Sequence, residues 1–431
     1  MPILEVETRP THIVAVIGGA VAGSEAAAHC AERGALVLVL EQNERPHGKI
    51  EDGLPRWHEK LREQEFERIR ENLSKPGVVF LPKTGLGKDV SLTTLREELG
   101  LSAVLLANGA WNDRPLPESI DRFAGKGLVY QNPFIHWFNH YREAGYAGPQ
   151  FPILDGTIVI GGGLASIDVA KVVNLELHAR ALAERGHEVD LVKMELRGIA
   201  ETVESLGLSL EELGIEGCTL YYRRRKEDMP LASASSDDPK AVAKAEAARV
   251  KIMDRVQRKY LVRFVELATP VAPIEEEGRL VGLVFQRNRM EGGKLVGDPA
   301  ETFEARSPMV ISSIGSIPRP IPGVPMKGEL YDYLDWSTGE LRGLPNVFGL
   351  GNVLTGKGNI KDSRENALEI SARVASAFLG LEARIGDGIG DEIRQRARVV
   401  AEAAMLAPPV PPERFELIRR FVESRQAKAG R

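Results

Sequence analysis

A glycine loop reads Val16-Ile17-Gly18-Gly19-Ala20-Val21-Ala22-Gly23-Ser24-Glu25-Ala26, between an apolar run and an Ala-rich segment with helical spacing. A second apolar run, Ala35–Leu40, follows and ends at Glu41, so the pattern predicts a βαβ unit. In a GxGxxG loop the first glycine makes the turn, the second admits a pyrophosphate, and the third lets helix pack on strand. Ala20 stands at the second glycine, and Glu41 lies 18 residues after Gly23, where a carboxylate accepts ribose hydroxyls. The alternative is a turn that binds nothing.

A second loop of the same kind follows the apolar residues 158–160 and reads Gly161-Gly162-Gly163-Leu164-Ala165-Ser166, with helical spacing after it. Two such units suggest two nucleotides. The next predicted strand, Thr219–Tyr222, is followed by Arg223-Arg224-Arg225-Lys226 and by no carboxylate. Guanidinium groups suit a 2'-phosphate, whereas a bare ribose would lack an acceptor there. This favours NADP(H) over NAD(H), with a solvated basic turn as the alternative.

Composition excludes several classes of protein. With 43% hydrophobic residues, 27% charged residues and a net charge of -5, the chain is typical of a soluble globular protein of two or three domains, and nucleic acid is a poor partner. No apolar run approaches the roughly 18 residues of a membrane span, and no targeting segment is visible, so we expect a cytoplasmic location. Cys30 and Cys218 are the only cysteines, which argues against iron–sulfur, structural zinc and dithiol sites, and no metal is expected.

Several segments between about residues 13 and 375 occur in an order that resembles a known family. Besides the two glycine loops, they are Pro46–His58, Ala107–Ala110, Ser312–Gly315 and Gly349–Ile360. The family is that of adrenodoxin reductase and the related bacterial ferredoxin-NADP reductases, and the glutamate synthase small subunit is similar. In this family the four segments resemble, in turn, the stretch beside the flavin, a turn by FAD, the SSIG strand and the loop over the flavin's pyrimidine end.

The resemblance implies an α/β fold with two Rossmann-like dinucleotide-binding domains, of the glutathione-reductase-like superfamily. Residues 1–117 and 320–431 would form a discontinuous FAD-binding domain with a C-terminal helical extension, and residues 118–319 an inserted NADP-binding domain. The residues expected at FAD are Gly18, Gly19, Ala20, Ala22, Gly23, Glu41, Gly48, Lys49, Ala107, Asn108, Gly109, Gly351, Asn352, Gly358, Asn359 and Ile360. Those expected at NADP(H) are Gly161, Gly163, Leu164, Ala165, Arg223 and Arg224.

The activity implied by the resemblance is FAD-dependent electron transfer between NADPH and a ferredoxin-like or flavodoxin-like carrier. By position, His58 and Asp168 correspond to family residues that approach each other near the flavin and nicotinamide and manage the proton. The alternatives for them are a surface histidine and a carboxylate that caps a helix. Two other functions stay open: an electron-input subunit of a larger oxidoreductase complex, and a non-catalytic flavin-binding structural subunit.

Some residues depart from the family pattern. Lys49, Glu51 and Asp52 replace residues that are usually apolar, basic and aromatic in the family, and Asn352 lies near a family Trp or Asp.

The segment Lys240–Arg263 holds eight basic and two acidic residues, a local charge of +6 that suits an acidic carrier. An ordinary solvated helix is the alternative.

The remaining sequence predicts four further features. They are a helical insertion of about forty residues before Thr219, an extended crossing over residues 310–325, a helix beyond Gly390, and a final helix over 413–426 after a Pro-rich break.

Overall fold

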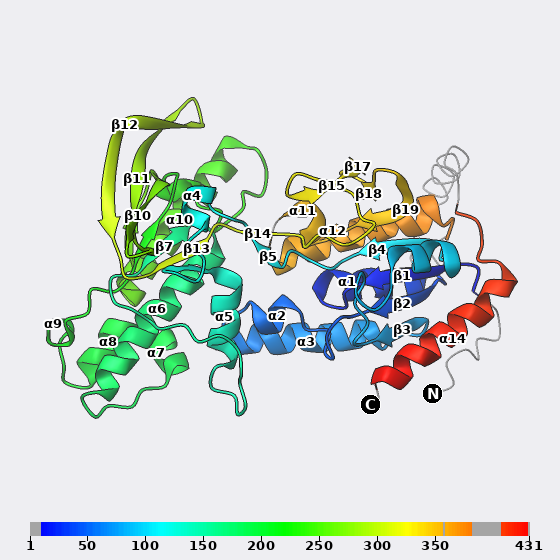
Figure 1. The fold of residues 1–431 in the computed structure, drawn as a ribbon, viewed down its shortest axis with the longest axis horizontal. Coiled ribbons are helices and arrows are strands. Elements are labelled where there is room, and N and C mark those ends of the chain that lie inside the picture. The colour runs from blue at the N-terminus through cyan, green and yellow to red at the C-terminus, as the bar shows by residue number, and fades with distance from the viewer. Residues whose placement is uncertain (1–9, 357, 382–406, 430–431) are drawn as a thin grey trace. The chain divides into compact units, whose positions relative to one another are not determined.

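The computed structural model describes residues 10–356, 358–381 and 407–429, which form two compact units (Figure 1). The described residues within 1–51, 59–112 and 316–431 form the first unit, and those within 52–58 and 113–315 form the second. The chain therefore leaves the first unit and later returns to it. The sequence analysis places residues 52–58 in the first domain, whereas in the structure Asp52–His58 group with the second unit.

A seven-stranded sheet forms the centre of the first unit, in the order β17-β18-β19-β4-β1-β2-β3. Strands β19, β4, β1, β2 and β3 run parallel, and β17 and β18 are antiparallel additions at one edge. Every residue of β1 and β2 is buried, as expected for strands inside a covered parallel sheet. The bounds are β1 Ile13–Ile17, β2 Leu36–Leu40, β3 Val78–Leu81, β4 Ala103–Leu106, β17 Tyr333–Asp335, β18 Glu340–Leu341 and β19 Leu344–Gly349.

Helices cover this sheet. The Ala-rich helix α1 packs against α3 and α12, and α14 lies along β3 (Figure 1). The bounds are α1 Val21–Glu32, α2 Lys49–Asp52, α3 Glu59–Leu73, α11 Asn352–Thr355, α12 Ile360–Arg373 and α14 Pro412–Ala429. Two π-helical turns, Thr94–Glu98 and Val374–Phe378, and a small hairpin of β15 Met326–Lys327 and β16 Leu330–Tyr331 complete the unit.

The second unit is built on a five-stranded parallel sheet of order β6-β13-β7-β8-β9. Its strands are β6 Leu128–Tyr130, β7 Ile158–Gly161, β8 Thr219–Tyr221, β9 Arg263–Val265 and β13 Val310–Ser313. Its helices are α4 Glu118–Asp121, α5 Gln131–His140, α6 Leu164–Ala183, α7 Leu191–Arg197, α8 Ile199–Ser205, α9 Leu210–Leu213 and α10 Pro239–Tyr260, with 3-10 turns at Arg56–His58 and Lys226–Asp228. Helices α7 to α9 confirm the predicted helical insertion.

A three-stranded antiparallel sheet, which the sequence analysis did not predict, also belongs to the second unit. It consists of β10 Ala268–Glu276, β11 Arg279–Glu291 and β12 Lys294–Arg306 (Figure 1). Phe285 of β11 stacks on Tyr221 at the end of β8, with ring centroids 4.2 Å apart, so the added sheet shares a hydrophobic core with the parallel one.

The predicted fold class is confirmed, because each unit holds a parallel sheet with a glycine loop at the carboxyl end of its central strand. Helix α14 confirms the final predicted helix. Short strands β5 Asn112–Asp113 and β14 Ser316–Ile317 lie where the chain passes between units. The helix predicted beyond Gly390 falls largely outside the described residues. Within the described ranges, no helix combines the length and apolar character of a membrane span.

Candidate functional site

The first glycine loop leaves no room for side chains at two of its glycines. Gly18 has φ +96°, and a Cβ there would lie 2.8 Å from the Ala107 carbonyl oxygen. A Cβ on Gly23 would lie 1.8 Å from the Gly18 carbonyl oxygen. The loop therefore requires glycine at these positions for α1 to pack on β1, as the spacing predicts.

Small residues from three other segments meet this loop. Gly48 passes so close to Ala20 that a Cβ would lie 2.9 Å from the Ala20 methyl, and a Cβ on Gly351 would lie 2.5 Å from that of Ala22. The third segment meets the loop at Ala107, whose carbonyl oxygen lies beside Gly18, and its Gly109 has φ +66°. These contacts bring four of the predicted FAD-binding segments together around the start of α1.

The Glu41 carboxylate is only 5% exposed and is held at the loop. Its Oε2 accepts a hydrogen bond from the Gly19 amide at 3.0 Å, and its Oε1 accepts one from the Asn43 amide at 3.0 Å. The predicted ribose acceptor thus lies beside the glycine loop at the end of β2.

Two buried amide oxygens in the first unit lack a hydrogen-bond partner among the described residues: Oδ1 of Asn108 and Oδ1 of Asn352. Asn108 uses its Nδ2 to donate to the Tyr331 hydroxyl at 3.0 Å. A buried acceptor without a donor is costly, so each is suited to a ligand that donates a hydrogen bond. Both residues belong to the predicted FAD set, and this unit fits a dinucleotide.

The other predicted residues of this set lie near helix ends. Gly351 is the N-cap of α11. Asn359 caps α12 by accepting a hydrogen bond from the Asp362 amide at 2.7 Å, and Gly358 and Ile360 flank it.

Lys49, which departs from the family pattern, donates to Ser316 Oγ at 3.1 Å, and its Nζ lies 5.7 Å from the centroid of the Trp111 ring. Lys49 is therefore anchored within the first unit.

The second glycine loop is packed on one side and open on the other. A Cβ on Gly161 would lie 2.4 Å from the Ser313 carbonyl oxygen, and one on Gly162 would lie 2.1 Å from the Tyr222 ring. Around Gly163, in contrast, no atom lies within 4 Å of the added Cβ. Gly163 is the N-cap of the 20-residue helix α6, and Leu164 and Ala165 after it are exposed. Open amides at a long helix N-terminus suit a phosphate group.

The basic run after β8 divides into two halves. Arg225 pairs with Asp228 through Nε at 3.0 Å and with Glu227 at 3.0 Å, and the bond from Arg225 holds the pKa of Asp228 below its usual value. Lys226 Nζ contacts Asp254 and Gln257, each at 2.9 Å. The side chains of Arg223 and Arg224 make no hydrogen bond or ion pair within the described part of the chain. Two guanidinium groups therefore remain available beside the loop.

His58 and Asp168, the predicted pair, lie together in the second unit, with Nε2 of His58 3.5 Å from one carboxylate oxygen of Asp168. The other oxygen lies 3.5 Å from Nζ of Lys171. Asp168 thus shares its two oxygens between an imidazole and an ammonium group.

Behind this pair lies a network that the sequence analysis missed. Lys171, with a side chain 7% exposed, pairs with Glu195 at 2.7 Å, and its Nζ lies 4.6 Å from the Trp57 ring centroid. The Tyr260 hydroxyl donates to Glu195 at 2.6 Å. Burial alone would raise the pKa of Glu195, but the bonds from Lys171 and Tyr260 outweigh burial and lower it. In the sequence, the feature that could have indicated this buried network is Lys171, a lysine within the apolar run that forms α6.

Replacing Lys171 with methionine is expected to lower the free energy of unfolding by about 3 kcal/mol, because Glu195 would stay buried without its cation. Urea denaturation measures this loss. The double variant Lys171→Met with Glu195→Gln should recover most of it, and Lys193→Met, at an exposed position of α7, should change stability by no more than about 0.5 kcal/mol. Equal losses in the single and double variants would contradict a buried ion pair.

The two cysteines are buried and unpaired. Burial raises the pKa of Cys30 to about 12 and that of Cys218 to about 12. Since the thiolate is the reactive form, neither thiol is suited to redox chemistry near neutral pH.

Comparisons with known proteins agree with this geometry, although no family profile matches the chain. The chain is 29% identical to the NADPH glutamate synthase small chain of Mycobacterium tuberculosis over 169 residues, which are 37% of this chain and 33% of that protein. It is 34% identical to the NADH glutamate synthase of Schizosaccharomyces pombe over 125 residues, 28% of this chain and 6% of that protein. The matched region spans a third or less of these curated relatives.

Among solved structures, that of Mycobacterium tuberculosis FprA in complex with NADPH matches with a TM-score of 0.69 and 19% identity, covering 97% of this chain and 91% of FprA. A second FprA structure, described as that of an oxidoreductase with a covalent modification of NADP+, gives a TM-score of 0.67 at 20% identity over the same shares. The chain therefore has the FprA fold along nearly its whole length.

Proposed function

We propose that this chain is an FAD-dependent oxidoreductase that transfers electrons between NADPH and a ferredoxin-like or flavodoxin-like carrier. The observation that carries the proposal is the second glycine loop, open at Gly163, with Arg223 and Arg224 making no ion pair within the described residues. The FprA fold supports it, since FprA was solved with NADPH.

The first unit would hold FAD. The Gly18–Gly23 loop would present backbone amides to the pyrophosphate, and Glu41 would accept from the ribose hydroxyls. When bound, a flavin supplies the conversion between hydride transfer and single-electron transfer. The amide oxygens of Asn108 and Asn352 would accept hydrogen bonds that they lack among the described residues.

The second unit would bind NADPH and hold a proton. The amides at the start of α6 would bind the pyrophosphate. The guanidinium groups of Arg223 and Arg224, which make no ion pair with any described residue, would bind the 2'-phosphate. His58 would hold a proton at Nε2, oriented by the Asp168 carboxylate 3.5 Å away. Lys171, which contacts the other oxygen of Asp168, would act as a positioning residue.

A test is to mix the purified, FAD-loaded chain with NADPH without oxygen and follow the flavin absorbance. We expect rapid bleaching, followed by reoxidation when an oxidised ferredoxin is added. Absence of bleaching despite bound FAD would exclude the catalytic proposal and leave a structural flavin-binding subunit. Bleaching without transfer to any small carrier would favour a subunit of a complex.

The similarity to the glutamate synthase small chain favours that second candidate, an electron-input subunit. In this case the acceptor is a partner subunit rather than a diffusing carrier. Co-purification of the untagged chain from its own cells distinguishes the two, because a subunit elutes with its partner at the mass of the complex.

The basic helix α10 is the surface that we propose for an acidic acceptor. Five exposed basic residues recur within a stripe about 60° wide at 100° per residue: Lys240, Lys244, Lys251, Arg255 and Arg258. In contrast, Arg249 donates to the carbonyls of Ala232 and Glu227, and Lys226 pairs with the acidic Asp254. The stripe therefore carries nearly uniform positive charge.

Reversing Arg255 and Arg258 to glutamate is expected to slow carrier reduction at least about tenfold at low salt, because charge complementarity speeds encounter. The remaining rate should depend less on salt as the Debye length falls from about 10 Å at 0.1 M to about 3 Å at 1 M. Flavin bleaching by NADPH should keep its original rate, and stopped-flow absorbance measures both steps. The matched reversal of Arg419 and Arg420, on α14, should leave both rates unchanged. If it slows carrier reduction instead, the carrier docks on α14.

A further inference from the structure

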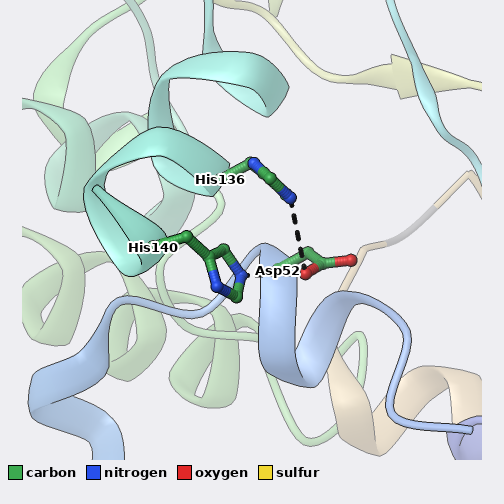
Figure 2. Close-up of side chains that lie close together, drawn as sticks. All are labelled: Asp52, His136 and His140. Atoms are coloured by element: carbon green, nitrogen blue, oxygen red, sulfur yellow. Dashed lines mark hydrogen bonds and ion pairs between the residues drawn. The ribbon is translucent and has the colours of Figure 1, made fainter. Parts of the chain in front are cut away.

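Three side chains of metal-ligand type that have no role in the proposed function converge in the second unit. His136 and His140 lie four residues apart on α5 and so share one face of the helix. Figure 2 shows both imidazoles directed toward Asp52, the last residue of α2. The distances to Asp52 Oδ1 are 3.2 Å from Nε2 of His140 and 3.9 Å from Nε2 of His136, and the three ligand atoms lie within 4.8 Å of one another.

The second nitrogen of His140 shows why a cation suits this place. Its Nδ1 lies 2.8 Å from Oε1 of Glu143, while its Nε2 faces Asp52. A neutral imidazole has one N–H, so it can donate to only one of these two carboxylates. If Nδ1–H donates to Glu143, Nε2 directs a lone pair at the Asp52 oxygen, and a cation between them turns this repulsion into attraction. Carboxylate–histidine–metal chains of this form hold the ring orientation in many metal sites.

We propose that Asp52, His136 and His140 bind one divalent transition-metal ion of the zinc and cobalt class, with water as the fourth ligand. Two imidazoles and one carboxylate suit these ions better than Mg²⁺ or Ca²⁺, which prefer oxygen ligands alone. Bonds of about 2.0–2.1 Å place tetrahedral ligand atoms roughly 3.3 Å apart, close to the contact of His140 with Asp52. The His136 side chain is 47% exposed, and its Nε2, now 3.9 Å from Asp52 Oδ1, would move closer on binding the ion.

The proposed ion would have a structural consequence. Asp52 begins the segment 52–58, which packs with the second unit and ends at His58. Asn139, next to His140 on α5, donates from Nδ2 to the Leu54 carbonyl at 2.9 Å. Trp57 of the segment also contacts the Phe138 ring of α5, with centroids 5.2 Å apart, and a metal bond to Asp52 would add a further attachment. The site is thus a metal clamp on the His58 segment, and it does not depend on the proposed redox activity.

The test uses the full-length chain with its affinity tag removed, freed of metal by a chelator and titrated with Co²⁺. We expect visible d–d absorption that saturates at one Co²⁺ per chain and is abolished by Zn²⁺. His140→Gln and His136→Gln should each weaken Co²⁺ binding at least about 100-fold. Glu143→Gln should weaken it about 10-fold to 100-fold, as loss of a partner of a ligating histidine does. His187→Gln, outside the site, is the matched control and should bind as the unmutated chain does.

Failure of the unmutated chain to bind Co²⁺ or Zn²⁺, or equal loss of binding in His187→Gln, would overturn the site. Because about half of the His136 side chain is exposed, its variant should fold even if the His140 variant does not. Hydrogen exchange provides a second readout: Zn²⁺ should slow amide exchange in residues 53–58 of the unmutated chain and leave it unchanged in His136→Gln. If one metal ion binds per chain without this protection, the proposal that the metal holds residues 52–58 against α5 is wrong.

Discussion

Replacing Arg223 and Arg224 together with alanine should lower kcat/KM for NADPH at least about a hundredfold and leave kcat/KM for NADH nearly unchanged. Both guanidinium groups lie after β8 without an ion pair among the described residues, whereas Arg225 and Lys226 are already paired. Each charge-assisted bond to the 2'-phosphate is worth about 1.5–3 kcal/mol, and every 1.4 kcal/mol is about tenfold. The loss should appear mainly in KM, because the 2'-phosphate takes no part in the chemical step.

The matched control removes two other arginines of the same unit. Arg289 and Arg306 lie on the three-stranded antiparallel sheet in exposed ion pairs, so their replacement with alanine should leave both nucleotide preferences intact. Steady-state kinetics with each nucleotide measures the effect. If the unmutated protein uses NADH as well as NADPH, the assignment of these arginines is incorrect.

Replacing Gly23 with alanine should produce a second large effect, on stability and on flavin content together. The new Cβ would lie 1.8 Å from the Gly18 carbonyl oxygen, which is backbone and cannot rotate away. Helix α1 would have to move off β1, at a cost of at least about 3 kcal/mol in the free energy of unfolding. The same movement would open the loop proposed to bind the FAD pyrophosphate, so the purified variant should contain little or no FAD.

The contrasting substitution is Gly163→Ala in the second loop, where the added Cβ meets no atom within 4 Å. Its free energy of unfolding should stay within about 1 kcal/mol of the unmutated value. Its KM for NADPH should rise if the pyrophosphate approaches this backbone. Urea denaturation and the flavin-to-protein absorbance ratio test both variants. A Gly23→Ala protein of normal stability and full FAD content would contradict the packing described for the loop.

The sequence predicted the parts of the fold that depend on local spacing. Both glycine loops, the strands before them and the helical insertion follow from periodicity and from residues that only a tight turn requires. The sequence also paired His58 with Asp168, although only through a family resemblance, and the structure brings the two within 3.5 Å.

The sequence could not reveal contacts between distant segments. Nothing in the local pattern of residues 52–58 indicates that they pack with the second unit, because that depends on contacts with residues far along the chain. The Lys171–Glu195 pair joins two helices for a similar reason. The run from Arg223 to Lys226 looks uniform in the sequence. The structure pairs Arg225 and Lys226 with nearby carboxylates, and Arg223 and Arg224 have no such partner among the described residues. The four-residue spacing of His136 and His140 is visible in the sequence, but their approach to Asp52 depends on the fold.

The burial of both native thiols makes this chain a convenient scaffold for site-specific labelling. Cys30 lies in the first unit and Cys218 in the second, and each has its pKa raised to about 12. Maleimide and methanethiosulfonate reagents should therefore not react with the folded, unmodified protein. One surface cysteine introduced into each unit would then carry a spin label or fluorophore without background. Distances between such labels, measured with and without NADPH, would report the separation of the two units in solution as nucleotide binds.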